Sequence, residues 1–356
     1  MKKILSLLVA LVLMLGCIAV AEVNFVDEGF NYEIAENAEG KEARIAVLMV
    51  NNNPFWVDVE SGAKAIQETM KKYNCTVDIQ TIEDFDAQVF ADAIDNCIIM
   101  EYDAICTVGV SDAIIPAVDR ATEAGIKVYT FNSDTSEECS RIAFHGQDLY
   151  GAGELAGETL AQLIGGEGKV AVITGLFSVP AHELRRTGGL ASLEKYEGIE
   201  IVGETECHDS GDEAYTQVKD FLTANPDLKG IYQTAGGQLG VIEAIKDMGM
   251  EGKVQYVCFD FMDEIVDALY DGIVGATIGQ DPFGQGADPV IFAYNAVITG
   301  EEAVTGNEWT KMDVVTPDNV AEYYPREFRT ISPMEALRLH QCTRTRFACV
   351  GRGAKQ

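Results

Sequence analysis

The feature that most constrains the fold is an alternation, from Arg44 onward, of short β-branched runs with longer segments of helical period. The first strand is expected at 45–50, and a helix at 56–73 follows it. Further strands are expected at 77–81, 104–108, 128–131, 170–175, 199–206, 230–234, 254–259 and 276–280. Helices are expected between them, at 87–100, 113–124, 151–164, 183–196, 213–224 and 239–248. This pattern predicts an α/β fold with parallel sheets, helices on both faces and right-handed crossovers.

The length of 356 residues implies more than one hydrophobic core, because cores of this type divide beyond roughly 250–300 residues. Two domains are therefore expected. The chain contains no long low-complexity tract, which is typical of a globular protein.

The N-terminus has the features of an export signal. Lys2 and Lys3 precede an apolar run over 4–15, which is shorter than the about 20 residues of a membrane span. Two processing sites compete, a lipobox-like Met14-Leu15-Gly16-Cys17 and a small-x-small cleavage site at Ala19-Val20-Ala21. We expect a signal peptide over 1–21, with lipid anchoring through Cys17 as the alternative, and an acidic spacer over 22–43.

The formal charge of −31 argues against nucleic acid as a partner, because an acidic surface repels phosphate backbones. The stretch 326–356 is the exception, since its basic residues outnumber the acidic ones and no core pattern is visible. We expect a disordered basic tail there, with a partner contact as the alternative.

Nine cysteines occur, without any Cys-x-x-Cys motif. Cys106 and Cys258 lie inside apolar runs, which predicts buried free thiols. Cys342 and Cys349 in the basic tail could pair with each other.

The segments that follow the predicted strands should carry the function, because ligands of such sheets bind beyond the carboxyl ends of the strands. Amides, carboxylates and aromatics dominate there, with no nucleophile beside a base. The segments are Asn51-Asn52-Asn53-Pro54-Phe55-Trp56, Asn132-Ser133-Asp134, Thr234-Ala235-Gly236-Gly237, Asp260-Phe261 and Gln280-Asp281-Pro282-Phe283.

The motifs of common enzymes are incomplete. Gly151, Gly153 and Gly157 lack the third glycine of a dinucleotide loop, which favours a close-packed helix start. Gly109-Val110-Ser111-Asp112-Ala113 lacks the last glycine of a nucleophile elbow. The four histidines, His145, His182, His208 and His340, show no metal-ligand spacing, and Asp209 with Asp212 lacks the rest of a calcium loop. We expect no catalytic residue, no metal and no cofactor.

Several ordered motifs together resemble the ribose-type periplasmic sugar-binding proteins over 44–324. They are Asn52-Asn53-Pro54-Phe55-Trp56, Phe131-Asn132-Ser133-Asp134, Phe259-Asp260 and Ala276-Thr277-Ile278-Gly279-Gln280. The resemblance implies two Rossmann-like lobes joined by a three-strand hinge, the type I periplasmic binding protein fold. The implied lobes are 44–146 with 281–311 and 147–280 with 312–325. The same lobes occur in repressors of the lactose type, but no helix-turn-helix precedes Arg44 here.

The resemblance also implies a set of ligand contacts. They are Asn53, Phe55, Trp56 and Asn132 in the first lobe, with Asp134 in reserve, Arg186, Asp209, Thr234 and Asp260 in the second, and Gln280 at a crossing. A sugar presents apolar C–H faces and a rim of hydroxyls, which aromatic walls, amides, carboxylates and a guanidinium can bind.

Structural roles compete with these assignments. Phe55 or Trp56 could staple the first helix, Asp260 could cap the helix that begins near Met262, and Asn132 could form only a turn. Arg186 could instead make an ion pair with Glu183. The ribose type has Asp-Arg where this chain has Asn132-Ser133 before Asp134, which makes ribose itself doubtful as the ligand.

The expected function is capture of a small sugar by lobe closure and its delivery to a membrane ABC permease with its ATPase. Alternatives are a receptor module for chemotaxis or signalling and an enzyme acting on a carbohydrate. We expect an exported monomer in the periplasm or on the outer face of the cytoplasmic membrane.

Overall fold

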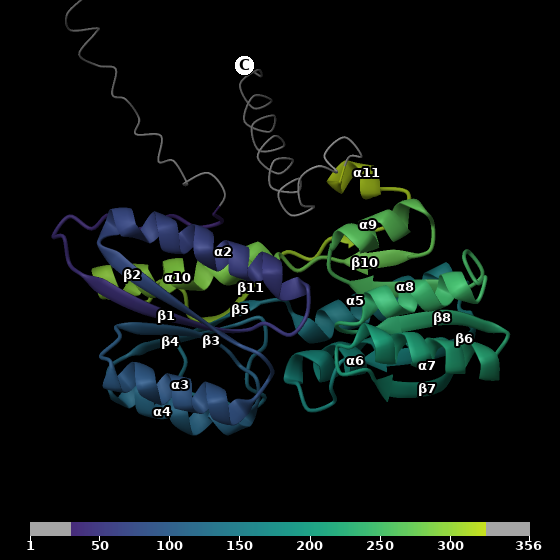
Figure 1. Cartoon of the computed structure of the whole chain (residues 1–356), viewed down its shortest axis with the longest axis horizontal. Helices are drawn as coiled ribbons and strands as arrows, with labels where there is room; N and C mark the ends of the chain where they lie inside the picture. The colour runs from purple at the N-terminus through teal and green to yellow at the C-terminus, as the bar shows by residue number, and fades with distance from the viewer. Residues whose placement is uncertain (1–29, 325–356) are drawn as a thin grey trace, which may run out of the picture.

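The computed structural model describes residues 30–324 and forms two α/β lobes that lie side by side (Figure 1). The predicted signal peptide, Cys17, Cys342, Cys349, His340 and the basic tail lie outside the described residues. Each lobe is a six-stranded sheet between two layers of helices, as the alternating pattern predicted.

The first lobe contains a fully parallel sheet. Its spatial order is β11 (Gly306–Trp309), β5 (Ala143–Gly146), β4 (Lys127–Phe131), β3 (Ala104–Val108), β1 (Ala43–Val50) and β2 (Cys75–Ile82). Helices α2 (Phe55–Met70) and α10 (Pro282–Thr299) cover one face, and α3 (Ala87–Ile99) and α4 (Ile115–Glu123) cover the other (Figure 1). The strands β1, β3 and β4 are almost wholly buried, which explains their continuous apolar runs.

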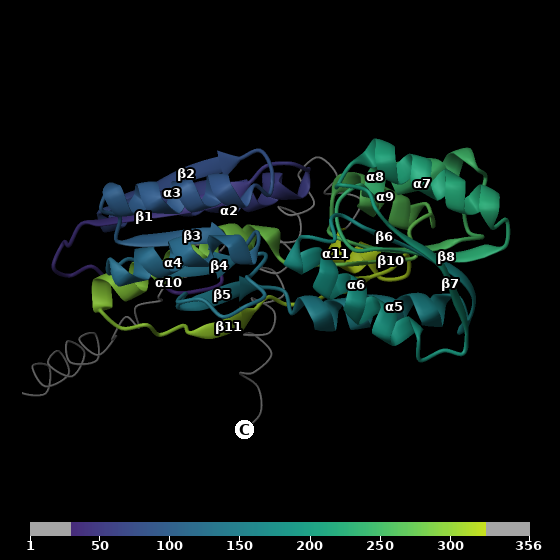
Figure 2. The same cartoon turned by 90° about the horizontal axis from the view of Figure 1, so that it is seen from below.

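The second lobe repeats this plan, with one antiparallel strand at its edge. Its order is β12 (Val314–Val315), β10 (Ala276–Ile278), β9 (Gln255–Phe259), β8 (Leu228–Gln233), β6 (Glu167–Thr174) and β7 (Gly198–Glu206). Helices α5 (Leu149–Leu163) and α6 (Pro180–Leu193) cover one face (Figure 2). Helices α7 (Gly211–Ala224), α8 (Gln238–Asp247) and α9 (Asp263–Tyr270) cover the other, and the short α11 (Val320–Tyr323) follows β12.

Glycines let the helices of one layer approach each other closely. A Cβ on Gly153 would lie 2.2 Å from the Arg185 carbonyl oxygen, and one on Gly157 would lie 2.4 Å from that of Gly189. Gly153 and Gly157, which form an incomplete dinucleotide motif, therefore allow α5 to pack closely on α6, as the sequence predicted. On the other lobe, a Cβ on Gly286 of α10 would meet the Val59 carbonyl oxygen of α2 at 2.0 Å.

The chain crosses between the lobes three times, and the crossings lie side by side. The first follows β5, the second joins β10 to α10, and the third joins β11 to β12. Backbone hydrogen bonds link them, from the Thr310 amide to the Gly146 carbonyl at 2.7 Å and from the Gly279 amide to the Asp313 carbonyl at 2.9 Å.

Residues 30–41 were expected to belong to an acidic spacer, but the structure packs them along α10. Phe30, Tyr32 and Ile34 lie against the core of the first lobe, and the Tyr32 hydroxyl donates to Glu308 at 2.7 Å. The Asn31 amide donates to Asp281 and to the buried Asp288, at 2.8 Å each. An alternation of apolar and polar residues over 30–34 indicates this one-sided burial, and the acidic composition had concealed it.

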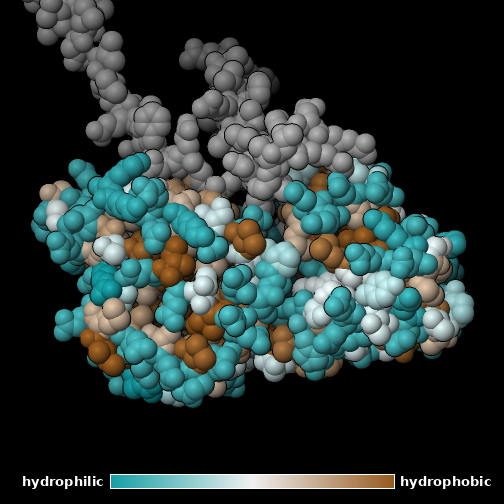
Figure 3. All heavy atoms as spheres, in the orientation of Figure 1, coloured by the Kyte–Doolittle hydropathy of each residue, from teal (hydrophilic) through white to brown (hydrophobic). Residues whose placement is uncertain are grey.

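Six cysteines of the described chain are free, and Cys106 and Cys258 are fully buried, as predicted. Hydrophilic residues predominate on the face shown in Figure 3, where the apolar ones form small scattered groups. Between residues 30 and 324, no helix is both long enough and apolar enough to span a membrane.

Candidate functional site

A pocket lies between the two lobes, beyond the carboxyl ends of several strands, where the topology predicts a ligand site. It holds about 390 Å³ of space between atoms, part of it open to solvent. The lining residues are Asn53, Phe55, Trp56, Phe85 and Asn132 from the first lobe, Leu149, Ala181, His182, Arg185, Ala235, Gly236 and Asp260 from the second, and Gln280 from a crossing.

Three aromatic rings form the wall of the first lobe. The centroids of Phe55 and Trp56 are 5.4 Å apart, and those of Trp56 and Phe85 are 6.3 Å apart, both in edge-to-face geometry. Trp56 is only 2% exposed and belongs to the core cluster. These rings therefore pack the start of α2, as the structural alternative held, and also present an apolar surface to the pocket.

Asn132, Asp209 and Asp260 follow strands β4, β7 and β9 and have left-handed backbones, with φ of 65°, 55° and 78°. Asparagine and aspartate tolerate this conformation better than other residues with a Cβ. A residue with this conformation makes the chain turn sharply at the end of the strand. Backbone strain of this kind is frequent at binding sites.

Among residues 30–324, Arg185 supplies the only guanidinium of the pocket lining, and most of its N–H donors bond other groups of the protein. Nε and Nη2 donate to Gln147 Oε1 at 3.0 and 2.7 Å, and Nη2 also donates to Gln280 Oε1 at 2.8 Å. Nη1 donates to the Thr234 carbonyl at 3.2 Å, and the guanidinium lies 4.1 Å from the centroid of the Phe259 ring. Burial lowers the pKa of Arg185, partly offset by Asp260.

Asp260 is buried opposite this guanidinium and is bound by two amides. Gln280 Nε2 donates to Oδ1 at 2.6 Å, and Gln238 Nε2 lies 3.4 Å from Oδ2. Burial raises the pKa of the Asp260 carboxyl, and the charge of Arg185 and both amides oppose this shift. The network continues through Gln285, which donates to the Gln280 carbonyl at 2.6 Å and accepts from Asn132 Nδ2 at 2.9 Å.

The two lobes contact each other across the cleft. Asn53 Nδ2 lies 3.3 Å from Asp209 Oδ2, and the rings of Phe85 and His182 are 5.8 Å apart in edge-to-face geometry. Phe85 also packs against Leu149 and Ala181. The pocket is therefore enclosed from both sides.

His182 has a defined tautomer. Its Nδ1 accepts a hydrogen bond from the Leu176 amide at 2.9 Å, so a neutral ring carries its proton on Nε2. Burial lowers the pKa of His182 from its ordinary value of 6.5, partly offset by Asp209. The imidazole therefore acts as a neutral group of the pocket wall at neutral pH.

Acidification is expected to destabilise the wild-type protein more than the His182→Gln variant. The unfolded chain takes up a proton on His182 near pH 6.5, whereas the folded chain takes it up only at lower pH. The contribution of His182 to the free energy of unfolding therefore falls as the pH drops below this value. Urea unfolding at pH of about 7, 6 and 5 measures the difference between the two proteins, and a difference independent of pH would contradict the assignment.

Six of the ten predicted contacts line the pocket, namely Asn53, Phe55, Trp56, Asn132, Asp260 and Gln280. Asp209 lies beside it and accepts from the Gly236 amide at 2.8 Å. Thr234 is fully buried behind Arg185, and its hydroxyl pairs with that of Thr174 at 2.8 Å.

Two predicted contacts lie elsewhere. Arg186 pairs with Glu183 at 2.6 Å and also with Glu204. These are the contacts expected from the alternative in which Arg186 forms an ion pair with Glu183. The guanidinium of the pocket belongs instead to its neighbour Arg185. Asp134 forms an ion pair with Arg141 and accepts from the Thr130 hydroxyl at 2.8 Å, because the turn directs it away from the pocket.

The rejected enzyme motifs have structural roles. Ser111 Oγ accepts from the Ala113 amide at 3.2 Å and caps a short 3-10 helix. Across residues 30–324, no cluster of three or more His, Cys, Asp or Glu side chains could hold a metal ion.

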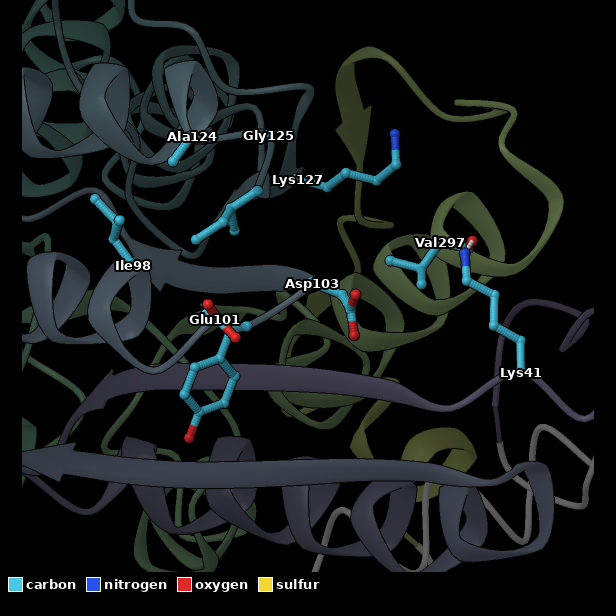
Figure 4. Close-up of a pocket in the computed structure, with 10 residues that line it drawn as sticks. Lys41, Ile98, Glu101, Asp103, Ala124, Gly125, Lys127 and Val297 are labelled. Atoms are coloured by element: carbon cyan, nitrogen blue, oxygen red, sulfur yellow. Dashed lines mark hydrogen bonds between the residues drawn. The ribbon is translucent and has the colours of Figure 1, made fainter.

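A second and more open pocket, with about 740 Å³ of space between atoms that includes open solvent, lies at the opposite edge of the first lobe, near the amino ends of β1, β3 and β4 (Figure 4). Its two lysines are already engaged. Lys41 Nζ donates to the Val297 carbonyl at 2.7 Å, and Lys127 Nζ pairs with Glu302 at 2.9 Å. Cations near the C-terminal end of α10 stabilise its exposed carbonyls, so these contacts have a structural explanation.

Comparison with known proteins agrees with this geometry. Residues 45–302 match the periplasmic binding protein domain. The chain is 27% identical over 271 residues to the D-allose-binding periplasmic protein of Escherichia coli, a match that covers 72% of this chain and 84% of that protein. It is 26% identical over 272 residues to the ribose import binding protein of the same organism, with 76% and 89% covered.

Solved structures give the same result. An ABC transporter solute-binding protein from Burkholderia graminis, in complex with D-arabinose, is 27% identical with a TM-score of 0.73, over 80% of this chain and 98% of that one. A periplasmic solute-binding protein from Actinobacillus succinogenes with bound D-allose is 25% identical with a TM-score of 0.73, over 79% and 100%. The resemblance to ribose-type proteins and the predicted type I fold are confirmed, and the chain belongs to the periplasmic binding protein family.

Proposed function

We propose that this chain captures a small neutral sugar in the cleft between its lobes and delivers it to a membrane ABC permease with its ATPase. Binding favours the closed arrangement of a two-state equilibrium, and no bond of the sugar is changed. The observation that supports this best is the composition of the enclosed pocket, which combines an aromatic wall with the Asp260 carboxylate, several amides and the Arg185 guanidinium.

The donors and acceptors of the pocket suit hydroxyl groups. Asp260 and Asp209 accept from sugar hydroxyls, Asn53 and Asn132 both donate and accept, and the rings at Phe55 and Trp56 pack against C–H faces. A wrong epimer would leave one of these buried groups unpaired, which gives the pocket its selectivity.

The charges of the pocket argue for a neutral ligand over an anionic one. Four of the five N–H donors of Arg185 have acceptors in the protein, so the guanidinium is not free to clamp a carboxylate or phosphate through two bonds. The carboxylates of Asp260 and Asp209 add repulsion toward an anion. We infer that aldoses and polyols bind, and that sugar phosphates and sugar acids do not.

The hinge of this proposed motion lies at the three crossings, near Gly146-Gln147, Gln280-Asp281 and the Lys311 region. The proposed lobes are 44–146 with 281–311 and 147–280 with 312–325, and residues 30–41 pack on the first of them. We further propose an exported monomer, with lipid anchoring through Cys17 as one form of its attachment, and no nucleic-acid partner.

A thermal-shift screen of the full chain tests the sugar assignment. D-allose, D-ribose, D-arabinose and myo-inositol are the neutral probes, and ribose 5-phosphate and glucuronate are the anionic ones. A ligand that binds only the folded state raises the melting temperature, by an amount that grows with its concentration over its Kd. We expect at least one neutral probe to raise it and neither anion to do so. A shift with nucleosides or amino acids and none with sugars would overturn the proposal.

A further inference from the structure

Gln147 is a buried residue of the first crossing that contacts the pocket only through Arg185. It lies between β5 of the first lobe and α5 of the second, is fully buried, and is absent from the pocket lining. Its Oε1 accepts from both Nε and Nη2 of Arg185, at 3.0 and 2.7 Å. This side chain therefore receives half of the hydrogen bonds that Arg185 makes to the protein.

The same amide connects two crossings to each other. Gln147 Nε2 donates at 3.0 Å to the carbonyl of Gly279, which precedes Gln280 in the second crossing. Gln280 in turn accepts from Arg185 Nη2 at 2.8 Å through its Oε1. One guanidinium of the second lobe is thus held at once by side chains from two of the segments that join the lobes.

The remaining donor of Arg185 is on Nη1, whose other N–H bonds the Thr234 carbonyl at 3.2 Å. Because a guanidinium is planar, fixing Nε and Nη2 also fixes the direction of both Nη1 hydrogens. Asp260, which also lines the pocket from the second lobe, accepts from Gln280 at 2.6 Å. Gln280 therefore bonds both the donor and the acceptor that the pocket offers to a ligand.

We infer that Gln147 is a positioning residue that sets the direction of the free N–H of Arg185 toward the ligand and links that direction to the arrangement of the crossings. This inference rests on the proposed function, because the ligand is the sugar proposed above. Gln147, Gly279, Gln280 and Arg185 all belong to the proposed second lobe, so we expect this support to persist when the lobes open and the donor to be directed before the sugar binds.

The test uses Gln147→Met, which keeps the length of the side chain and removes both its acceptor and its donor, and Gln147→Glu, which keeps the acceptor toward Arg185 and removes only the donor toward Gly279. Calorimetric titration uses the neutral sugar among D-allose, D-ribose and D-arabinose that binds the wild-type protein. We expect Gln147→Met to weaken binding about tenfold or more, since it leaves buried donors unpaired, and Gln147→Glu to retain affinity within about threefold of wild type. Gln67→Met is the matched control, because Gln67 bonds the Val77 carbonyl at 2.7 Å far from the pocket and should leave affinity unchanged.

A double-mutant cycle separates positioning from a general structural defect. In an Arg185→Met background, Gln147→Met should cause no further loss of affinity, whereas a defect that acts independently of Arg185 would add its full effect. Equal binding by wild type and Gln147→Met, or additive losses in the cycle, would overturn the inference.

A ligand-free measurement keeps this inference distinct from the proposed function. The melting temperatures of the same four proteins without sugar should show coupling between Gln147 and Arg185, and additive changes would overturn the link on their own. If the wild-type protein binds none of the sugars, the proposed function fails and the role of Gln147 toward a sugar fails with it, whatever the coupling. If the wild-type protein binds a sugar and the Gln147 variants bind it equally well, only the inference about Gln147 fails and the proposed function stands.

Discussion

Replacing Asp260 with asparagine is expected to weaken sugar binding about 10- to 150-fold while leaving the protein as stable as wild type or slightly more so. A hydrogen bond to a charged acceptor contributes about 1.5–3 kcal/mol, which corresponds to that range of affinity. Stability should not fall, because burial raises the pKa of Asp260 and the folded protein therefore holds this charge at a cost. Calorimetric titration and urea unfolding measure the two effects separately.

Asparagine is the appropriate substitution because the backbone at Asp260 has a φ of 78°. Alanine would add backbone strain and confuse the two measurements. Asp134→Asn is the matched control, since Asp134 was also a predicted contact but pairs with Arg141 outside the pocket. Loss of affinity in Asp134→Asn as large as in Asp260→Asn would contradict the placement of the site.

The sheets were predictable wherever the strands are buried on both faces. β1, β3, β4 and β9 consist mainly of apolar and β-branched residues, and their positions agree with the predicted strands within a few residues. β5 and β11 were not predicted, because they are four residues long and contain His145, Glu308 and a glycine each. These two strands pair with each other although they are far apart in the sequence, and no local pattern indicates such a pairing.

Helix α10 was also missed, for a related reason. It contains Pro289 and two glycines, Gly284 and Gly286, which disfavour helix in isolation. In the folded protein Gly286 permits contact with α2, and residues 30–41 cover the outer side of α10. Tertiary packing therefore overrides the local preference, and the sequence alone does not show it.

The pocket was predictable on the first lobe, where the contacts follow strand ends directly. Asn53, Phe55, Trp56 and Asn132 all line it. The sequence did not indicate the lining residues that lie inside a helix or whose neighbours are distant in the chain. Phe85 and His182 line the pocket but were not predicted, because nothing in their own segments shows that they meet across the cleft.

Helical period could have distinguished Arg185, which lines the pocket, from its neighbour Arg186. The buried positions of α6 are Ala181, His182, Arg185, Gly188, Gly189, Ser192 and Leu193, which form one stripe at spacings of three and four. Arg186 lies off that stripe. A charged residue on the buried stripe of a helix that begins at the cleft is therefore the better candidate for a ligand contact.

Arg185→Lys is expected to impair both stability and sugar binding severely, and Arg186→Lys to impair neither. The three donors of a lysine ammonium leave one point, whereas Gln147, Gln280 and the Thr234 carbonyl are arranged around three separate nitrogens of the guanidinium, so lysine does not reach all of them. The amide oxygens left without donors are buried, at a cost of about 1–3 kcal/mol each. We expect the free energy of unfolding to fall by about 2–4 kcal/mol and sugar affinity to fall at least about tenfold.

Arg186 provides the control because it has the same side chain as Arg185 but lies in a different environment. Its pairs with Glu183 and Glu204 are partly exposed, and ion pairs of this kind contribute about 0–1 kcal/mol, much of which lysine retains. Urea unfolding and calorimetric titration of both variants decide between the two arginines. Impaired binding by Arg186→Lys with normal binding by Arg185→Lys would return the ligand contact to the residue that the family resemblance implied, and would require the start of α6 to be rotated from its present position.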